Sequence, residues 1–140
     1  MIQFLDTSAL AKRYLAERGS RELRAGLKRA QIAVARITYA EMFAAVARAC
    51  REGIIDEAGR ERIFAAVAED FRELTVVEVR GSTLMSVPDL VRRHPLRGYD
   101  AVQLACALTL HRAGASVTFW SGDERLCQAA RAEALRTMRA

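Results

Sequence analysis

Four acidic residues lie close to the starts of predicted helices, at junctions that follow predicted strands. They are Asp6, Glu41, Asp100 and Asp123. In a sheet of parallel strands the carboxyl ends share one edge, so these acids are expected to meet there. Carboxylate oxygens without a nearby His or Cys are ligands that suit Mg²⁺ or Mn²⁺. The pattern therefore predicts a magnesium site, and on a small basic chain such a site indicates phosphodiester chemistry.

Each acid also has a local structural explanation. The segment from Thr38 to Glu41 fits a capping box, Asp6 and Asp123 suit the first turn of a helix, and Asp100 suits the positive end of a helix dipole. Taken singly, capping is the simpler interpretation. Four carboxylates about 5 Å apart, however, repel by about 3 kcal/mol per pair at an effective dielectric near 20. Such a cluster needs protons, basic partners or a divalent cation.

Alternating strands and helices are predicted along the whole chain. Short apolar runs predict strands at 2–5, 31–37, 75–79 and 116–120. Helices are predicted at 8–17, 21–29, 38–52 and 56–73, in a stretch from 81 that Pro88 distorts and Pro95 ends, at 100–111, and from 124 onward. The tail AEALRTMRA fits either a helix or a short irregular end. This alternation predicts an α/β domain with a mostly parallel sheet.

Length and composition predict one globular domain over residues 1–140. Hydrophobic residues make up 51% of the chain and charged residues 28%. No apolar run approaches the roughly 18–20 residues that cross a bilayer, and no secretory leader is visible, so we expect a cytoplasmic protein. The net charge of +5, carried almost wholly by arginine, permits binding to a polyanion. The three cysteines lack zinc-ligand spacing and are expected to be small buried apolar residues.

Four segments, taken in order, resemble a known family. They are FLDTSALAKRY, TYAEMFAA, HPLRGYDAVQLACAL and VTFWSGDERLCQAA. In this order and spacing the chain resembles the PIN-domain nucleases, and among them the VapC-type toxins of toxin–antitoxin pairs. The resemblance implies a PIN-like three-layer α/β/α domain and an endoribonuclease that depends on Mg²⁺ or Mn²⁺. It also implies a homodimer inhibited by a small antitoxin. The tail lacks the clear final strand and proline of that family, which leaves a last strand in doubt.

The resemblance assigns roles to particular residues. Asp6, Glu41 and Asp100 match the core acidic ligands, and Asp123 matches a fourth acid that acts through water or a second ion. Two small polar residues match positions beside the ligands, Thr7 and Ser121. We therefore expect hydroxide to be generated from water at the metal and to attack phosphorus in line.

Two sets of residues are candidates for binding partners. Arginines near the acids in sequence are hypothetical contacts for the RNA backbone, namely Arg13, Arg97 and Arg125. The early helices and the following helical pair also carry apolar residues that are either core-facing or part of a groove for an antitoxin helix. These are Leu15, Leu23, Leu27, Phe64 and Val67.

Three alternatives compete with this interpretation. A receiver-type phosphotransfer domain needs paired acids after its first strand and a lysine after its last, but no lysine follows Lys28. A haloacid-dehalogenase-type phosphatase needs an acid where this chain has Ser8. The third is a catalytically weak or inactive PIN-like module that only binds RNA or protein, and the presence of all four acids argues against lost catalysis.

Overall fold

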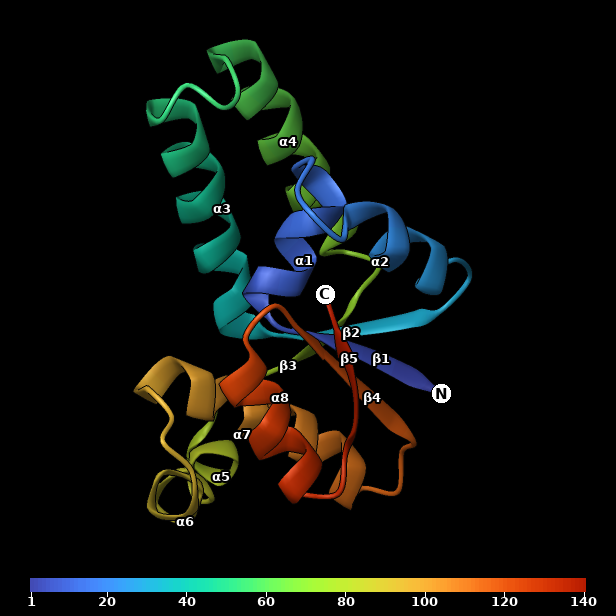
Figure 1. The fold of residues 1–140 in the computed structure, drawn as a ribbon, viewed down its shortest axis with the longest axis vertical. Helices are drawn as coiled ribbons and strands as arrows, with labels where there is room; N and C mark the ends of the chain where they lie inside the picture. The colour runs from blue at the N-terminus through green and yellow to red at the C-terminus, as the bar shows by residue number, and fades with distance from the viewer.

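The computed structural model describes residues 1–140 and has a five-stranded, fully parallel sheet at its centre (Figure 1). The strand order is β3-β2-β1-β4-β5, and every neighbouring pair runs parallel. The strands are β1 Ile2–Leu5, β2 Gln31–Ala35, β3 Thr75–Val77, β4 Val117–Ser121 and β5 Arg136–Arg139. Because parallel pairing requires crossovers, helices must cover both faces of this sheet.

Eight helices form the two outer layers. On one face lie α1 Thr7–Tyr14, α2 Ser20–Gly26, α3 Arg36–Arg51 and α4 Glu57–Asp70. Against the other face lie α5 Gly81–Leu84, α6 Val87–Arg93, α7 Gly98–Arg112 and α8 Glu124–Ala132. The layers confirm the predicted three-layer α/β/α architecture. No helix has both the length and the apolar character needed to span a bilayer.

Alternating residues of each central strand build two separate cores. On β1, Phe4 belongs to the core under α7 and α8, whereas Leu5 belongs to the core under α1–α4. On β4, Phe119 and Trp120 divide in the same way. The rings of Phe4 and Phe119 stack with centroids 5.7 Å apart. Strands that are apolar on both sides are typical of a covered parallel sheet, which explains why they read as short continuous apolar runs.

The α3–α4 pair forms an antiparallel hairpin whose tip projects beyond the sheet (Figure 1). Asp56 begins α4 as its N-cap, with its carboxylate accepting a hydrogen bond from the Gly59 amide at 2.6 Å. Met42, Val46 and Val67 of the hairpin are buried in the core, whereas Ile54 at its tip is 66% exposed. The tip therefore presents apolar surface to solvent.

Several predicted boundaries differ from the structure, and the ends of two strands differ for one physical reason. The strand expected at 31–37 ends at Ala35, where the chain turns directly into α3. The strand expected at 75–79 pairs only as far as Val77, which lies opposite Ala35. Once β2 has become a helix, residues 78 and 79 have no strand to pair with. Helix α1 similarly begins at Thr7, one residue earlier than predicted.

The tail is a strand, and both of the interpretations that the sequence left open were wrong. Helix α8 gives way at Ala134, whose φ of 67° is left-handed. Buried Leu135 then anchors the chain, and Arg136 to Arg139 pair with Thr118 to Ser121 of β4. The segment has little apolar character of its own, so its strand conformation depends on the backbone groups that β4 presents.

The cysteines are free thiols, as their spacing predicted. Cys106 and Cys127 are buried and Cys50 is half-buried. Burial raises the pKa of Cys106 to about 12 and also raises that of Cys127. These two thiols therefore stay protonated and pack as small apolar groups.

Candidate active site

One pocket of about 300 Å³ contains all four acids that the sequence singled out. Asp6 directly follows β1, Asp123 lies just beyond β4, Glu41 is in the second turn of α3, and Asp100 is in the first turn of α7. The pocket is lined by Asp6, Thr7, Ser8, Ala11, Glu41, Ala45, Arg97, Tyr99, Asp100, Gln103 and Asp123. We call it the acid pocket. Residues far apart in the sequence thus converge at the carboxyl end of the sheet.

Asp100 reaches this pocket by a different route from the one predicted. It does not follow a strand, because β3 is followed by α5 and α6 before α7 begins. Helix α7 starts at Gly98 rather than at Asp100. The side chain of Asp100 is 25% exposed and accepts a hydrogen bond from Nε of Arg97 at 3.3 Å. Its position depends on how the whole buried helix α7 crosses the sheet.

Asp6 is almost completely buried, with 5% of its surface exposed. Its Oδ1 accepts from the Ala9 amide at 2.8 Å and from Oγ of Ser8 at 2.7 Å, and its Oδ2 accepts from Oγ of Ser121 at 2.5 Å. Burial raises the pKa of Asp6; these hydrogen bonds only partly oppose the rise, and the charge of Asp100 adds to it. Asp6 is therefore both the N-cap of α1 and a carboxylate under electrostatic stress.

Glu41 is held by neutral donors from two other helices. Its Oε1 accepts from Oγ1 of Thr7 at 2.7 Å and from Nε2 of Gln103 at 3.0 Å. Nε2 of Gln103 also lies 2.9 Å from Oγ1 of Thr38 and 3.2 Å from Oγ1 of Thr7. The predicted capping box of Thr38 and Glu41 was wrong, because α3 begins at Arg36 and both residues lie inside it. Both side chains face α7 instead.

Gln103 makes an incomplete set of hydrogen bonds. Its side chain is buried, and Oε1 is the one buried side-chain polar atom in the molecule that has no partner. A carboxylate can only accept, so the N–H side of the amide must face Glu41 and the carbonyl must turn away. An unsatisfied buried carbonyl costs about 1–3 kcal/mol. The orientation of this amide is consequently set by Glu41, and it leaves the carbonyl oxygen of Gln103 without a hydrogen bond.

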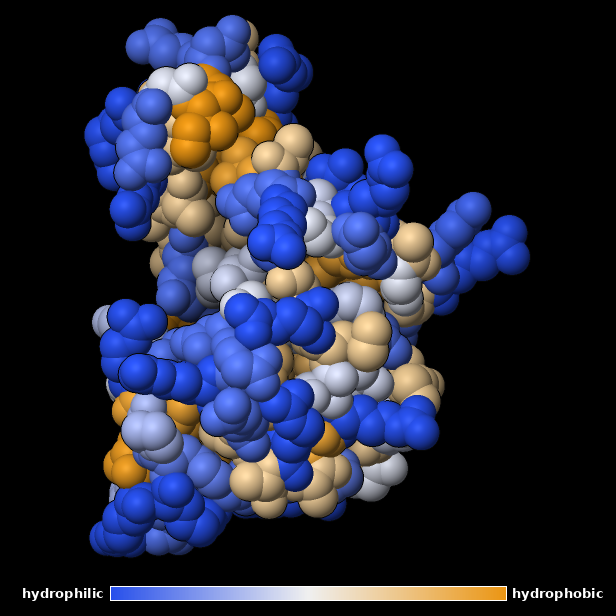
Figure 2. All heavy atoms as spheres, viewed as in Figure 1, coloured by the Kyte–Doolittle hydropathy of each residue, from blue (hydrophilic) through white to orange (hydrophobic).

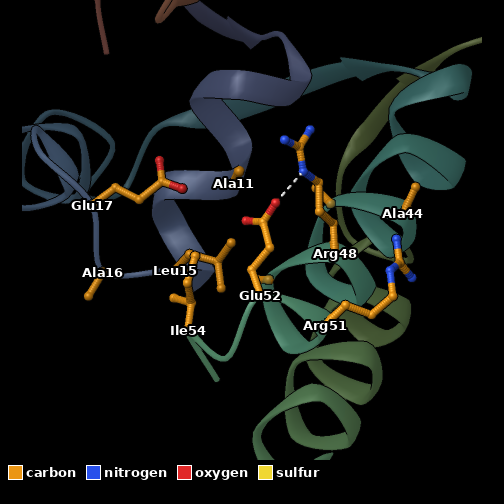
Figure 3. Close-up of a pocket in the computed structure, with 11 residues that line it drawn as sticks. Ala11, Leu15, Ala16, Glu17, Ala44, Arg48, Arg51, Glu52 and Ile54 are labelled. Carbon is orange, nitrogen blue, oxygen red and sulfur yellow. Dashed lines mark hydrogen bonds and ion pairs between the residues drawn. The ribbon is translucent and has the colours of Figure 1, made fainter. Parts of the chain in front are cut away.

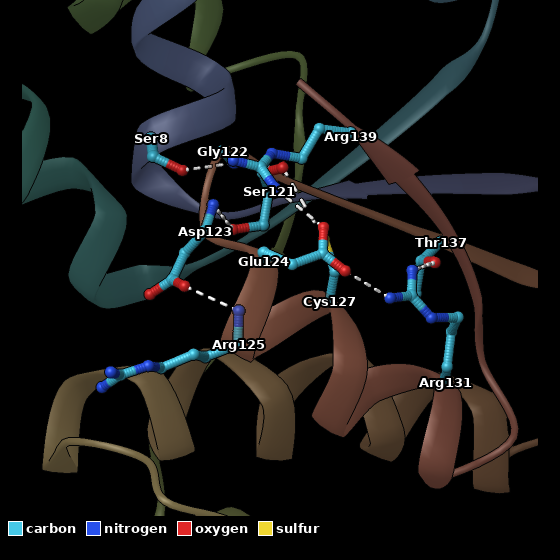
Figure 4. Close-up of polar contacts among 10 residues, drawn as sticks. All are labelled: Ser8, Ser121, Gly122, Asp123, Glu124, Arg125, Cys127, Arg131, Thr137 and Arg139. Atoms are coloured by element: carbon cyan, nitrogen blue, oxygen red, sulfur yellow. Dashed lines mark hydrogen bonds and ion pairs between the residues drawn. The ribbon is translucent and has the colours of Figure 1, made fainter.

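Asp123 caps the last helix. Its Oδ1 accepts from the amide of Arg125 at 2.9 Å, and its own amide donates to Oγ of Ser121 at 3.0 Å (Figure 4). Ser121 thereby joins Asp6 to Asp123, since the same hydroxyl donates to Asp6. Ser8 makes a parallel link, accepting from the Gly122 amide at 2.9 Å. The strand-to-helix turn after β4 is fixed by the hydroxyls that also orient Asp6.

The donor set of this pocket suits a hard divalent cation. No three acidic or thiol groups converge closely enough to form a ready-made metal cluster. The pocket nevertheless gathers four carboxylates, amide and hydroxyl oxygens, and no sulfur or imidazole. Its single arginine, Arg97, pairs loosely with Asp100 and leaves Asp6 and Glu41 without a positive partner. Oxygen ligands with uncompensated negative charge are what Mg²⁺ and Mn²⁺ prefer.

The three candidate RNA-binding arginines lie in different surroundings. Arg97 lines the acid pocket, and its side chain is 88% exposed. Arg125 contacts Asp123 through its backbone amide. Arg13 does not line the pocket; its guanidinium lies 3.7 Å from Asp70 of α4. Of the three, Arg97 is the one whose charge is at the mouth of the pocket.

Three polar or aromatic residues of the pocket were missed by the sequence analysis. Ser8 was expected to begin a helix and was given no role at the site, although a hydroxyl two residues after Asp6 is well placed to bond it. Gln103 is the one amide inside the apolar segment AVQLACAL, and a lone polar side chain in a buried helix signals a specific partner. Tyr99, which is 68% exposed, gave no signal in the sequence.

A second hollow lies between α1 and α3 (Figure 3). Its volume is about 580 Å³, and its lining combines small or aliphatic residues with charged ones: Ala11, Leu15, Ala16, Glu17, Ala44, Ala45, Arg48, Ala49, Arg51, Glu52 and Ile54. We call it the hairpin groove. Figure 2 shows hydrophobic surface over the α3–α4 hairpin with hydrophilic residues around it. Ala11 and Ala45 belong to both this groove and the acid pocket.

The apolar residues expected in such a groove mostly lie elsewhere. Leu23, Leu27 and Val67 are buried in the core, and Phe64 is half-buried against it. Leu15 is also largely buried, but it does line the groove. For the three core residues the core-facing interpretation holds, because their helices cover the sheet. The groove instead uses alanines and Ile54, which is 66% exposed.

The fold and the acid pocket define the class of this protein. The PIN domain family model matches residues 3–132, so the chain belongs to the PIN domain family. The chain is 36% identical to Ribonuclease VapC45 of Mycobacterium tuberculosis (strain CDC 1551 / Oshkosh) over 138 residues, covering 95% of this chain and 92% of the relative. The same figures hold for Ribonuclease VapC49 of strain ATCC 25618 / H37Rv. These similarities confirm the resemblance to VapC-type proteins.

Solved structures support the fold at lower sequence identity. VapBC2 from Rickettsia felis, bound to a DNA fragment from their promoter, aligns with a TM-score of 0.66 at 14% identity, covering 100% of this chain and 99% of that one. VapBC-1 from nontypeable Haemophilus influenzae gives 0.66 at 16% identity, with 99% and 98% covered. The sarcin-ricin loop cleaving toxin VapC20 of Mycobacterium tuberculosis gives 0.64 at 18% identity, with 91% and 94% covered.

Proposed function

We propose that this protein is a divalent-metal-dependent endoribonuclease that acts as the toxin of a toxin–antitoxin pair. The observation that carries the proposal is the convergence of four carboxylates from four separate elements in one pocket. The names of the relatives, which are ribonucleases, support the reaction class. The intact set of acids gives no support to a non-catalytic binding module. Cleavage of RNA phosphodiester bonds by hydrolysis is the activity that fits.

Asp6, Glu41 and Asp100 would hold Mg²⁺, for which Mn²⁺ can substitute, and Asp123 would hold a second ion or orient the attacking water. The cation would supply positive charge and Lewis acidity to the phosphodiester and to a water molecule. Thr7 and Gln103 keep Glu41 turned toward the pocket through the hydrogen bonds to its Oε1.

The remaining neighbours favour the charged form of Asp6 and would hold the RNA in place. Ser8 and Ser121 donate to the two oxygens of Asp6, which favours its charged form. The exposed guanidinium of Arg97 stands at the mouth of the pocket and would bind a backbone phosphate. Arg125 would contribute at longer range.

The direct test compares carboxylate-to-amide variants. Asp6→Asn and Asp100→Asn are expected to lower Mg²⁺-dependent cleavage of a labelled RNA at least about 100-fold, because each removes a charged ligand. Asp89→Asn is the matched control, since Asp89 is exposed on α6 and pairs only with Arg92. Full activity in either pocket variant, or equal cleavage in EDTA, would refute the scheme.

The partner we propose is an antitoxin whose helix lies in the hairpin groove. The groove has an apolar floor and charged rims, as expected for a site that takes one face of an amphipathic helix. One structural neighbour is itself a toxin–antitoxin complex, from Klebsiella pneumoniae. We further propose that the protein is a cytoplasmic homodimer. Light scattering at micromolar concentration tests the oligomeric state, and a monomer would contradict it.

A further inference from the structure

A third hollow adjoins the acid pocket beyond Arg97 and Asp100. Its volume is about 550 Å³, and its lining residues are Glu41, Val87, Arg97, Gly98, Tyr99, Asp100 and Val102. Four of these also line the acid pocket: Glu41, Arg97, Tyr99 and Asp100. The two hollows therefore adjoin along a shared wall, and the third hollow adds the apolar side chains of Val87 and Val102. We name this third hollow the base hollow.

We propose that the base hollow holds a nucleobase of the RNA strand, one that neighbours the cleaved bond, stacked on Tyr99. This inference rests on the proposed ribonuclease function. Tyr99 is 68% exposed and stands on the first turn of α7, whereas Val87 and Val102 are half-buried and pack against the core. A fixed apolar floor with an exposed aromatic ring is the arrangement on which bases of single-stranded RNA stack.

The order of residues on α7 supports this occupant over a purely apolar one. Tyr99 immediately precedes the acid Asp100, and Arg97 lies on the wall shared by both hollows. A strand with its phosphate at the acid pocket would thus meet a guanidinium and an aromatic ring in succession. The apolar surface suits a base, and the guanidinium suits a phosphate. The carboxylates suit the cation that would act on the neighbouring phosphodiester.

Stacking also provides affinity that does not depend on metal. Glu41 and Asp100 repel the RNA backbone when no cation is bound, but they do not oppose contact between a base and the Tyr99 ring. Every base has a π-face, so the base hollow adds affinity and register without strong sequence preference. The contribution of Tyr99 is therefore measurable in EDTA, where no cleavage takes place.

The test is a double cycle between the protein and the RNA. Wild type is compared with three variants, namely Tyr99→Ala, Tyr99→Trp and the control Met138→Ala. The substrates are an RNA that is cleaved at one bond and a series of the same RNA in which each nucleotide in turn lacks its base. Met138 is 47% exposed on β5, away from both hollows. Tyr99→Ala is expected to lower kcat/KM about 5- to 150-fold, which corresponds to about 1–3 kcal/mol. Tyr99→Trp keeps the activity.

The abasic series decides the proposal. At one position beside the cleaved bond, removal of the base should abolish the difference between wild type and Tyr99→Ala. The absence of any coupled position, or a Tyr99→Ala protein as active as Met138→Ala, overturns the base hollow while leaving the ribonuclease proposal intact. If wild type cleaves no RNA, the ribonuclease proposal fails instead. Anisotropy of fluorescein-labelled RNA in EDTA then decides stacking alone, with loss of affinity in Tyr99→Ala supporting it and equal affinity refuting it.

Discussion

At the scale of single residues, Asp6 serves two purposes that conflict. As the N-cap of α1 it accepts from the Ala9 amide, which stabilises the helix. As a carboxylate in the acid pocket it is buried, and burial raises its pKa. The folded chain therefore retains a proton on Asp6 at a pH where the unfolded chain has lost it. Above that range the ionised group lowers the free energy of unfolding.

Asp6→Asn is accordingly expected to stabilise the metal-free protein while abolishing cleavage. Asn caps a helix about as well as Asp and carries no charge to bury. At pH 7 in EDTA the gain should be about 1 kcal/mol, or roughly 2–8 °C in Tm for a chain of this size. The gain should vanish as the pH falls below the pKa of an unfolded Asp. Asp56→Asn is the control, because Asp56 is the exposed N-cap of α4, and it should not share the gain.

Gln103 offers a second prediction at this scale. Gln103→Met has nearly the same shape, removes the unpartnered Oε1, and leaves Glu41 with Thr7 as its only donor. Removal of a hydrogen bond that orients a ligand typically lowers metal affinity about 10- to 100-fold. Calorimetric titration with Mn²⁺ should show that loss with little change in Tm. Gln31→Met, at the exposed first residue of β2, is the control. Mn²⁺ binding equal to wild type in Gln103→Met would contradict a positioning role.

At the scale of elements, Glu133 joins the end of α8 to the segment that leads into α7. Its Oε1 lies 2.8 Å from Nε2 of His94 and 2.8 Å from a guanidinium nitrogen of Arg93. Burial alone would raise the pKa of Glu133, but the hydrogen bonds from His94 and Arg93 outweigh it and hold that pKa below the ordinary 4.5. The charged form therefore stabilises the fold above that pH, and this stabilisation disappears as the pH falls through the folded pKa.

Glu133→Gln is expected to lower the free energy of unfolding by roughly 1–2 kcal/mol at pH 6–7. The difference from wild type should shrink steadily below pH ~4.5, where the wild-type carboxylate also takes up a proton. Urea denaturation from pH 3 to 7 measures both. Glu69→Gln is the control, because Glu69 pairs with Arg72 in an exposed position and such pairs contribute little. If the difference in free energy of unfolding between wild type and Glu133→Gln grew toward low pH, the charged form of Glu133 would not be the stabilising one.

The same scale explains what the sequence could predict. The alternation of apolar runs and helices was sufficient to predict that Asp6 and Asp123 lie close together, because both follow central parallel strands. Asp100 joins them only because of the way α7 crosses the sheet. Since α7 is apolar on nearly every side, its sequence does not indicate which face points toward the pocket. Gln103 was hidden because a single amide does not alter that pattern. The strand β5 was unpredictable from RTMR because its pairing depends on β4 and on buried Leu135.

At the scale of the whole molecule, the acid pocket and the hairpin groove are separated only by Ala11 and Ala45. A partner in the groove would therefore lie directly beside the four acids of the acid pocket. Ile54→Glu should weaken binding of the co-expressed antitoxin at least about tenfold, since it places a charge on the apolar floor. RNA cleavage by the free variant should stay unchanged, because Ile54 is 66% exposed and lines only the groove.

Isothermal titration of the purified variant with its antitoxin measures this effect, and Met138→Glu serves as an exposed apolar-to-acidic control on β5. Equal affinity for wild type and Ile54→Glu would place the partner elsewhere on the surface. A simultaneous loss of RNA cleavage would mean that the groove also takes part in the reaction.

The outermost strand has a consequence for behaviour in concentrated solution. Residues Arg136 and Arg139 are exposed on β5, and Arg139 is held by Glu124 of α8 at 2.7 Å. A second molecule pairing along β5 would bring its own arginines against these, and the nearby acid, Glu124, already pairs with Arg131 and Arg139. Short, positively charged outer strands of this kind discourage fibre formation. We therefore expect the protein to resist polymerisation through its own backbone.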